Sequence, residues 1–217
     1  NYMLVFSVQG LINEYVEQCG AIRQGKLVED IEPLTDVEEI EFSPPFGTLE
    51  AFNTSGGTST LPHTLLRLVR ELDYKTIRYP GHASTMRALL ELGLMDGTPV
   101  DLGGTRVSPR LLLEALIEKN LPRGDDDVTL VRVEVSGRKN GAPARAVYEM
   151  IDYSDDRTGL TAMMRGTAFP ASIVCLMMAR GQTPPGAMPQ ELAVDPDTFI
   201  EDFLARGMPL EMRREEK

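Results

Sequence analysis

The sequence predicts an α+β fold with a mixed, largely antiparallel sheet. Alternating apolar and polar residues flank short turns at Gln24-Gly25 and Asn140-Gly141, a pattern typical of antiparallel hairpins. Segments with helical apolar spacing lie between the strands without regular βαβ alternation, which argues against a doubly wound parallel sheet. With 217 residues, 42% of them hydrophobic, the chain is long enough for one large domain, and we expect a single domain over 1–217.

The individual elements follow from apolar periodicity and from Gly, Pro and capping residues at their ends. Helices are expected at 7–19, 62–72, 82–92, 108–121, 159–180 and 197–206. Strands are expected within 21–30, which folds back on itself, and at 37–43, 47–54, 74–79, 127–137 and 144–154. Four prolines make 183–196 a loop, and the region 159–217 is expected to be mainly helical.

The charge balance limits the partners. A net charge of -11 and a pI near 4.7 argue against nucleic acid or an anionic membrane surface as the main partner. The apolar run 168–179 is shorter than a bilayer span, and no signal peptide is visible, so a cytoplasmic protein is expected. Cys19 and Cys175 fit reduced, buried thiols. The start without Met suggests a fragment of a longer chain.

Several catalytic and binding motifs are missing from the sequence. It has no G-x-G-x-x-G after a strand, no phosphate-binding P-loop and no G-x-S-x-G elbow, so no dinucleotide or triad site is predicted. His63 and His82 are the only histidines, which leaves little material for a metal site or for a free-standing hydrolase. The loop 54–60, "TSGGTST", is either an anion-binding nest or a plain connection.

The stretch "RYPGH" places Arg78, Tyr79 and His82 where a predicted strand turns into a helix. An arginine can hold a carboxylate with two hydrogen bonds, and a helix start favours anions. The same residues could instead cap the helix and pack the edge of the sheet. Both interpretations stay open on local physics alone.

The polar residues of 152–167 have two interpretations as well. Asp152, Asp155 and Asp156 could bind a hard cation, although carboxylates that form turns or cap helices are commoner. Arg165 and Thr167 are polar exceptions in an apolar segment, and buried polar groups need partners.

Taken in order, five segments resemble the C-terminal domain of the saccharopine dehydrogenase-like oxidoreductases, and most closely the lysine 6-dehydrogenase branch. They are "NYMLVFSVQGLINEYVE", "RQGKLVEDIEPLTDVEEIEF", "LEAFNTSGGTSTLP", "KTIRYPGHASTMRALLELGL" and "DRTGLTAMMRGTAFPASIVCLMMARG". Where members of that family often show R-T-T-G, this chain has Arg165-Gly166-Thr167-Ala168.

The resemblance implies an NAD(P)-dependent dehydrogenase with two domains, in which this chain binds the substrate and forms the homodimer interface. An N-terminal Rossmann domain outside the sequence would bind NAD or NADP, and the final helices would pack on it. The fragment would hold no cofactor and no metal and would be inactive alone. Hydride would move between the nicotinamide and a carbon that bears an amine or imine in lysine, saccharopine or a related amino acid.

The resemblance also implies site residues. Arg78, with help from the helix end after Gly81, would hold a substrate carboxylate, and His82 or Tyr79 would orient the amine or relay its proton. The remaining substrate-binding candidates are Tyr2, Ser7, Gln9 and Thr167. The alternative is a non-enzymatic binding or oligomerisation module that keeps the fold. A Rossmann fingerprint encoded directly before Asn1 would favour the enzyme.

Overall fold

The structure is a computed structural model that describes residues 2–216, and it divides into two compact units. The N-terminal unit is Asn1–Pro122 and the C-terminal unit is Arg123–Lys217. Each unit has its own cluster of buried apolar side chains. The expectation of a single domain over 1–217 stays a prediction.

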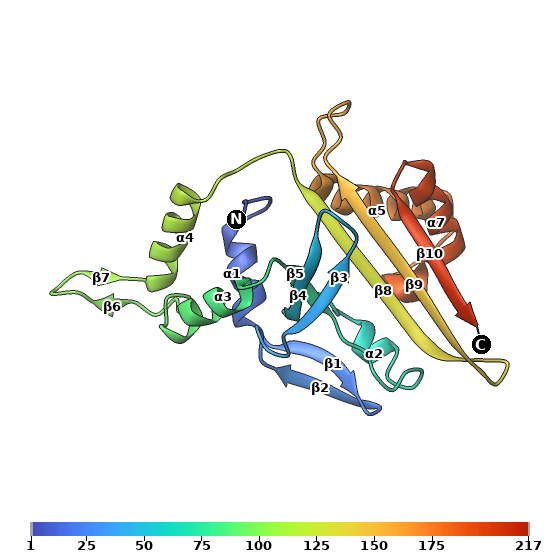
Figure 1. The fold of residues 1–217 in the computed structure, drawn as a ribbon, viewed down its shortest axis with the longest axis horizontal. Helices are drawn as coiled ribbons and strands as arrows, with labels where there is room; N and C mark the ends of the chain where they lie inside the picture. Colours follow the sequence, from blue (N-terminus) through green and yellow to red (C-terminus); the bar gives the residue numbers. More distant parts are fainter. Residues whose placement is uncertain (1, 217) are drawn as a thin grey trace. The chain divides into compact units, whose positions relative to one another are not determined.

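Small antiparallel sheets and three longer helices build the N-terminal unit (Figure 1). In chain order its elements are α1 (Val8–Val16), β1 (Cys19–Arg23), β2 (Lys26–Ile31), β3 (Glu38–Phe42), β4 (Gly47–Asn53), α2 (Leu61–Thr64), β5 (Lys75–Arg78), α3 (His82–Glu91), β6 (Val100–Asp101), β7 (Arg106–Val107) and α4 (Pro109–Asn120). β4 is the centre of the sheet β3-β4-β5, while β1-β2 and β6-β7 are separate hairpins. This confirms the largely antiparallel α+β prediction.

Helix α1 carries much of the core of this unit. The Ser7 hydroxyl accepts a hydrogen bond from Gly10 N at 3.0 Å and so caps the helix start. The buried side of α1 packs against α3 and α4. The buried members of this core are Leu4, Val8, Leu11, Ile12, Tyr15, Leu34, Phe52, Ala83, Met86, Met95, Leu113 and Ile117. One core thus fixes α1, the sheet and the start of α3 relative to one another.

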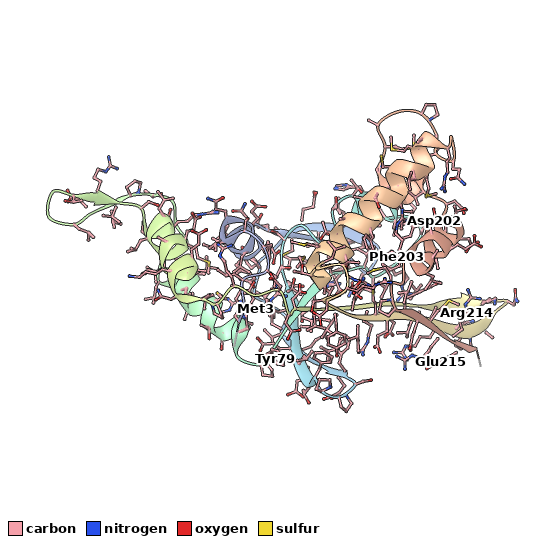
Figure 2. The ribbon with its side chains drawn as sticks, turned by 90° about the horizontal axis from the view of Figure 1, so that it is seen from above. Met3, Tyr79, Asp202, Phe203, Arg214 and Glu215 are labelled. Carbon is pink, nitrogen blue, oxygen red and sulfur yellow. The ribbon has the colours of Figure 1, made fainter. Side chains whose placement is uncertain are left out.

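The C-terminal unit is a three-stranded antiparallel sheet covered on one face by α5 and α7 (Figure 1). Its elements are β8 (Val128–Lys139), β9 (Ala142–Tyr153), α5 (Ala162–Ala179), α6 (Gln190–Ala193), α7 (Pro196–Ala205) and β10 (Leu210–Glu216), with the sheet order β10-β9-β8. Its core consists of Met150, Ile173, Met177, Phe203 and Met208. Figure 2 labels Phe203 on α7, which contributes the aromatic part of this core.

Helix α5 begins at a double cap. Both carboxylate oxygens of buried Asp127 accept backbone N–H groups, from Ala162 at 2.5 Å and Met163 at 2.9 Å, and Thr161 Oγ1 accepts from Met164 N. By length and composition alone, this helix is apolar enough to cross a membrane, with a mean hydropathy of 1.4 over 18 residues. Its Ile173 and Met177 are fully buried in the core described above, as in a helix that packs on a sheet.

Two predicted elements are wrong, and in both places backbone pairing overrides local preference. The helix expected over 62–72 ends at Thr64, because Leu72 and Ile22 exchange two backbone hydrogen bonds of 2.8 and 3.0 Å. Gly25 N also donates to Arg70 O at 2.8 Å, which ties the segment to the β1-β2 hairpin.

The end of the chain is the second error. The helical region expected over 159–217 contains α5, α6 and α7 but ends in β10, which pairs with β9 from Leu210↔Met150 to Glu216↔Ala144. Its charged composition gives no strand signal, and the partner strand decides the conformation. Cys175 is exposed, against the expectation of a buried thiol, whereas Cys19 is buried.

Candidate functional site

Six side chains from five segments of the N-terminal unit form one network of contacts that includes a guanidinium group. We call this group the Arg78 cluster, and it consists of Tyr2, Glu14, Tyr15, Phe52, Arg78 and His82. Tyr2 comes from the N-terminal segment, Glu14 and Tyr15 from α1 and Phe52 from β4. Arg78 ends β5, and His82 begins α3. The fold therefore brings Arg78 and His82 into the same cluster, as the sequence predicted.

The turn between β5 and α3 is held by a carboxylate from the neighbouring strand. Gly81 has φ 94°, a left-handed conformation that a side chain would strain. Glu50, opposite Arg78 in the β4-β5 register, accepts backbone N–H groups from Gly81 at 3.0 Å and Ala83 at 2.6 Å. The helix end that we expected to help bind a substrate carboxylate is thus already occupied by Glu50.

His82 is enclosed by aromatic rings. Its Nε2 lies 2.9 Å from the hydroxyl of the fully buried Tyr15, and its ring stacks on Phe52 with the centroids 6.2 Å apart. The Tyr2 ring approaches from another side, at 5.2 Å between centroids. The imidazole is consequently held in one orientation.

The same packing keeps the His82 ring neutral. Burial, reinforced by the nearby positive charge of Arg78, lowers the pKa of His82 to about 4, although Glu50 acts in the opposite direction. Burial raises the pKa of Tyr15, so its phenol keeps the proton and can donate it to Nε2. His82 is therefore uncharged at neutral pH in this fold, and its role in a proton relay stays a prediction.

We expect the unfolding free energy of the chain to fall as the pH is lowered from about 6.5 to about 4, by at most about 3 kcal/mol from His82. The sign follows because the unfolded histidine takes up a proton below its ordinary pKa, whereas the folded one does not until about pH 4. NMR titration of the imidazole checks the midpoint directly.

Tyr15→Phe removes the hydroxyl that holds the neutral ring and should move the His82 midpoint upward, whereas Tyr79→Phe should not move it. A His82 midpoint near 6.5 in the wild-type chain would contradict the assigned environment.

Arg78 and Glu14 lie close together without a hydrogen bond. The Nη2 of Arg78 is 3.8 Å from Oε2 of Glu14, with the side chains 24% and 31% exposed. Nη1 of Arg78 donates to Ile77 O at 3.0 Å, and its guanidinium carbon is 5.9 Å from the centroid of the Tyr2 ring. Burial raises the pKa of Glu14, and Arg78 opposes that shift. Arg78 also acts on the phenols of Tyr2 and Tyr15 through charge and hydrogen bonding, whereas Oε2 of Glu14 and Nε of Arg78 have no hydrogen-bond partner among the described residues.

The other residues predicted from the N-terminal segment and from "RYPGH" lie outside this cluster. Tyr79 is 56% exposed, and Figure 2 shows it at the outer edge of its unit; only its carbonyl contacts His82, accepting from the backbone N at 3.3 Å. Ser7 is exposed and caps α1. Gln9 is exposed, and its carbonyl accepts from Arg110 Nη2 at 3.4 Å. Of the N-terminal candidates, Tyr2 alone joins the Arg78 cluster.

Among the candidates in the C-terminal unit, Arg165 and Asp155 have hydrogen-bond partners within the fold. Arg165 is 8% exposed and donates to Asp152 through two hydrogen bonds of 2.9 and 3.1 Å, with Phe169 packed against its guanidinium. Asp155 accepts from Arg157 N and Thr158 Oγ1 and so forms a turn. Thr167 is exposed within α5, where its hydroxyl lies 3.7 Å from the Met163 sulfur.

Asp152 is therefore a carboxylate paired with Arg165, and Asp155 is a carboxylate that forms a turn. Among the described residues, no group of three or more His, Cys, Asp or Glu side chains is placed to hold a metal ion.

Three of the five hydroxyl groups of the "TSGGTST" loop form hydrogen bonds within the chain. Thr54 bonds Thr76 at 2.7 Å, Ser55 Oγ donates to Asn13 O at 3.2 Å, and Thr58 donates to Gly20 O at 3.0 Å. These bonds fasten the end of α1 to the sheet and so help to position Glu14. The loop therefore has a structural role as a connection between β4 and α2.

Sequence reasoning missed four residues that shape the site, namely Glu14, Glu50, Phe52 and Tyr15. Tyr15 lies on the buried face of the helix predicted over 7–19, and its hydroxyl is the hydrogen-bond partner of His82. That hydroxyl on an apolar face was the available signal, since buried polar groups find partners. Glu50 and Phe52 come from β4, and only the fold brings them to the β5-α3 turn.

Comparison with known proteins decides the family. A family model described as the saccharopine dehydrogenase C-terminal domain matches residues 1–208. The chain belongs to this family. Its fold is similar to that of an apo, histidine-tagged saccharopine dehydrogenase (L-Glu forming) from Saccharomyces cerevisiae, with a TM-score of 0.71 and 14% sequence identity. The match covers 99% of this chain and 62% of the yeast chain, so this saccharopine dehydrogenase C-terminal domain spans less than two thirds of the yeast enzyme's length.

Proposed function

We propose that this chain is the substrate-binding part of an oxidoreductase that acts on the CH-NH group of lysine, saccharopine or a related amino acid. NAD or NADP would be bound mainly by an N-terminal domain outside this sequence. The glycine-rich loop "TSGGTST" between β4 and α2 lacks the G-x-G-x-x-G spacing of a dinucleotide site, and three of its hydroxyls are already bonded within the chain. We therefore assign the chain to substrate recognition.

The observation that carries the proposal is the Arg78 cluster. It presents a permanently charged guanidinium, one of whose nitrogens, Nη2, is held 3.8 Å from a carboxylate but not bonded to it. A substrate carboxylate is the group that a guanidinium binds best, through two parallel hydrogen bonds. The neutral, aromatic-packed His82 next to it adds no second positive charge at neutral pH. These properties suit a small amino acid more than a phosphate or a polymer.

The full-length protein tests the function. We expect NAD(P)H to form when it is incubated with NAD or NADP and with lysine, saccharopine or another diamino acid, while the 217-residue chain alone should form none. Absorbance of the reduced nicotinamide is the measurement. If neither cofactor were reduced with any of these amino acids, the non-enzymatic binding module would become the better interpretation.

The partner domain and the homodimer stay predictions. Several apolar side chains of α5 are exposed in the C-terminal unit, notably Met164 at 52% and Met178 at 61%. Such exposed apolar groups on one helix support the proposal that the helix packs on another domain of the full-length protein.

A further inference from the structure

We propose that Glu14 and Arg78 together bind the zwitterionic end of an amino acid, Glu14 accepting from its ammonium group and Arg78 donating to its carboxylate. This inference rests on the proposed function, and it adds Glu14 as the residue that selects substrates with an amino group next to the carboxylate. Glu14 lies within an ordinary amphipathic helix, and no local sequence pattern singles it out.

The first observation is the pattern of unused atoms. Oε2 of Glu14 and Nε of Arg78 are both buried, and neither has a hydrogen-bond partner among the residues that the structure describes. One atom is an acceptor and the other a donor. Buried polar atoms without partners are rare in folded proteins, because each costs the solvation that it lost. The two atoms therefore point to a bound group that offers both a donor and an acceptor.

The second observation is the separation. Oε2 of Glu14 and Nη2 of Arg78 are 3.8 Å apart, too far for a direct hydrogen bond but close enough for attraction. An α-amino acid carries its ammonium and carboxylate on one carbon, so it can reach a carboxylate and a guanidinium that lie side by side. A ligand of this kind would form hydrogen bonds with Glu14 and with Arg78 at the same time.

The surroundings favour this ligand over other small molecules. The Tyr2 ring lies against the Arg78 guanidinium at 5.9 Å, and the Tyr15 hydroxyl is bonded to His82, so one wall of the site is aromatic. A divalent cation would need several oxygen ligands, and the described residues provide no cluster of three or more such groups here. A dianion would be repelled by Glu14. A ligand with an ammonium group next to a carboxylate fits best, because the ammonium pairs with Glu14 and the carboxylate pairs with Arg78.

The orientation of Glu14 is built into the fold. Ser55 N donates to the Glu14 carbonyl at 3.1 Å, and Ser55 Oγ donates to Asn13 O at 3.2 Å, which fixes the last turn of α1. Arg78 is fixed by its bond to Ile77 O and by the β4-β5 pairing. The two partners are thus positioned independently by α1 and by the sheet, as expected of a preorganised site.

Equilibrium binding to the full-length protein without nucleotide tests the proposal. Calorimetry compares L-lysine with 6-aminohexanoate, which keeps the carboxylate and the distal amine but lacks the α-amino group. Wild-type protein should bind lysine at least about 10-fold more tightly. In Glu14→Gln that preference should shrink to about 1-fold. Glu17→Gln, the same change three residues along and exposed, should keep the wild-type preference.

The preference is a ratio measured within each protein, so a variant that merely loses stability does not mimic the effect. Retained binding of 6-aminohexanoate also shows that Glu14→Gln is folded. A wild-type protein that binds neither lysine nor saccharopine, or an unchanged preference in Glu14→Gln, would overturn the proposal. A protein that binds lysine through Glu14 but never reduces NAD or NADP would instead remove the proposed reaction and keep the binding site.

Discussion

Arg78→Ala in the full-length protein is expected to lower kcat/KM for the amino-acid substrate about 100- to 10,000-fold, mainly through a higher KM. The reason is the loss of two charge-assisted hydrogen bonds to the substrate carboxylate, each contributing about 1.5–3 kcal/mol. Arg78→Lys should lie between wild type and alanine, because a lysine keeps the charge but not the two-pronged geometry. Steady-state kinetics with varied amino-acid concentration measures the effect.

Arg106→Ala is the matched control, since Arg106 is an exposed arginine of the same unit in the short strand β7. Its kinetic constants should stay at wild-type values. An Arg78→Ala protein with an unchanged KM would remove Arg78 from carboxylate binding. Because the substitution also leaves Glu14 without its neighbouring charge, circular dichroism of the variant should accompany the kinetics.

Arg165→Met is expected to destabilise the C-terminal unit by about 3–5 kcal/mol, the range for breaking a buried ion pair from one side. Asp152 is 3% exposed, and it would lose both hydrogen bonds from the guanidinium. The Gly207 carbonyl would lose a third, at 3.3 Å. Urea unfolding of the 217-residue chain, followed by a probe in this unit, measures the loss.

The double variant Asp152→Asn with Arg165→Met separates the charge from the packing. It should recover much of the stability, because the isolated buried carboxylate is the main cost. Arg180→Met removes a largely exposed partner of Asp202 at 3.5 Å and should have little effect. Full stability in Arg165→Met alone would argue that Asp152 is not a buried charged partner of Arg165 at all.

The strand, turn and helix predicted around "RYPGH" are confirmed, whereas the roles of its residues stay predictions. Strand, turn and helix were readable because Pro80-Gly81 is a strong local signal, and the structure confirms β5 and α3 around it. Which side chains face the site was not readable. The turn sends Tyr79 outward and buries His82 against Tyr15 and Phe52, which come from distant segments.

The same distinction explains the errors of secondary structure. The segment 210–216 contains Glu, Arg and Met, which favour helix in isolation, yet it forms β10. Backbone pairing with β9 and cross-strand ion pairs, such as Arg213 to Glu149 at 3.1 Å, outweigh that preference. Local propensities amount to tenths of a kcal/mol per residue, whereas a strand position in a sheet gains hydrogen bonds and packing together.

By itself the sequence determined the α+β class, most helix and strand positions, and two members of the Arg78 cluster, Arg78 and His82. It did so because apolar periodicity, glycine turns and prolines act over a few residues. Only the tertiary structure decided that Glu14 and Tyr15 belong with them, that Glu50 occupies the helix end and that Arg165 is committed to Asp152. Those choices depend on contacts between segments that are far apart in the chain, where burial sets the charge and the partner of each group.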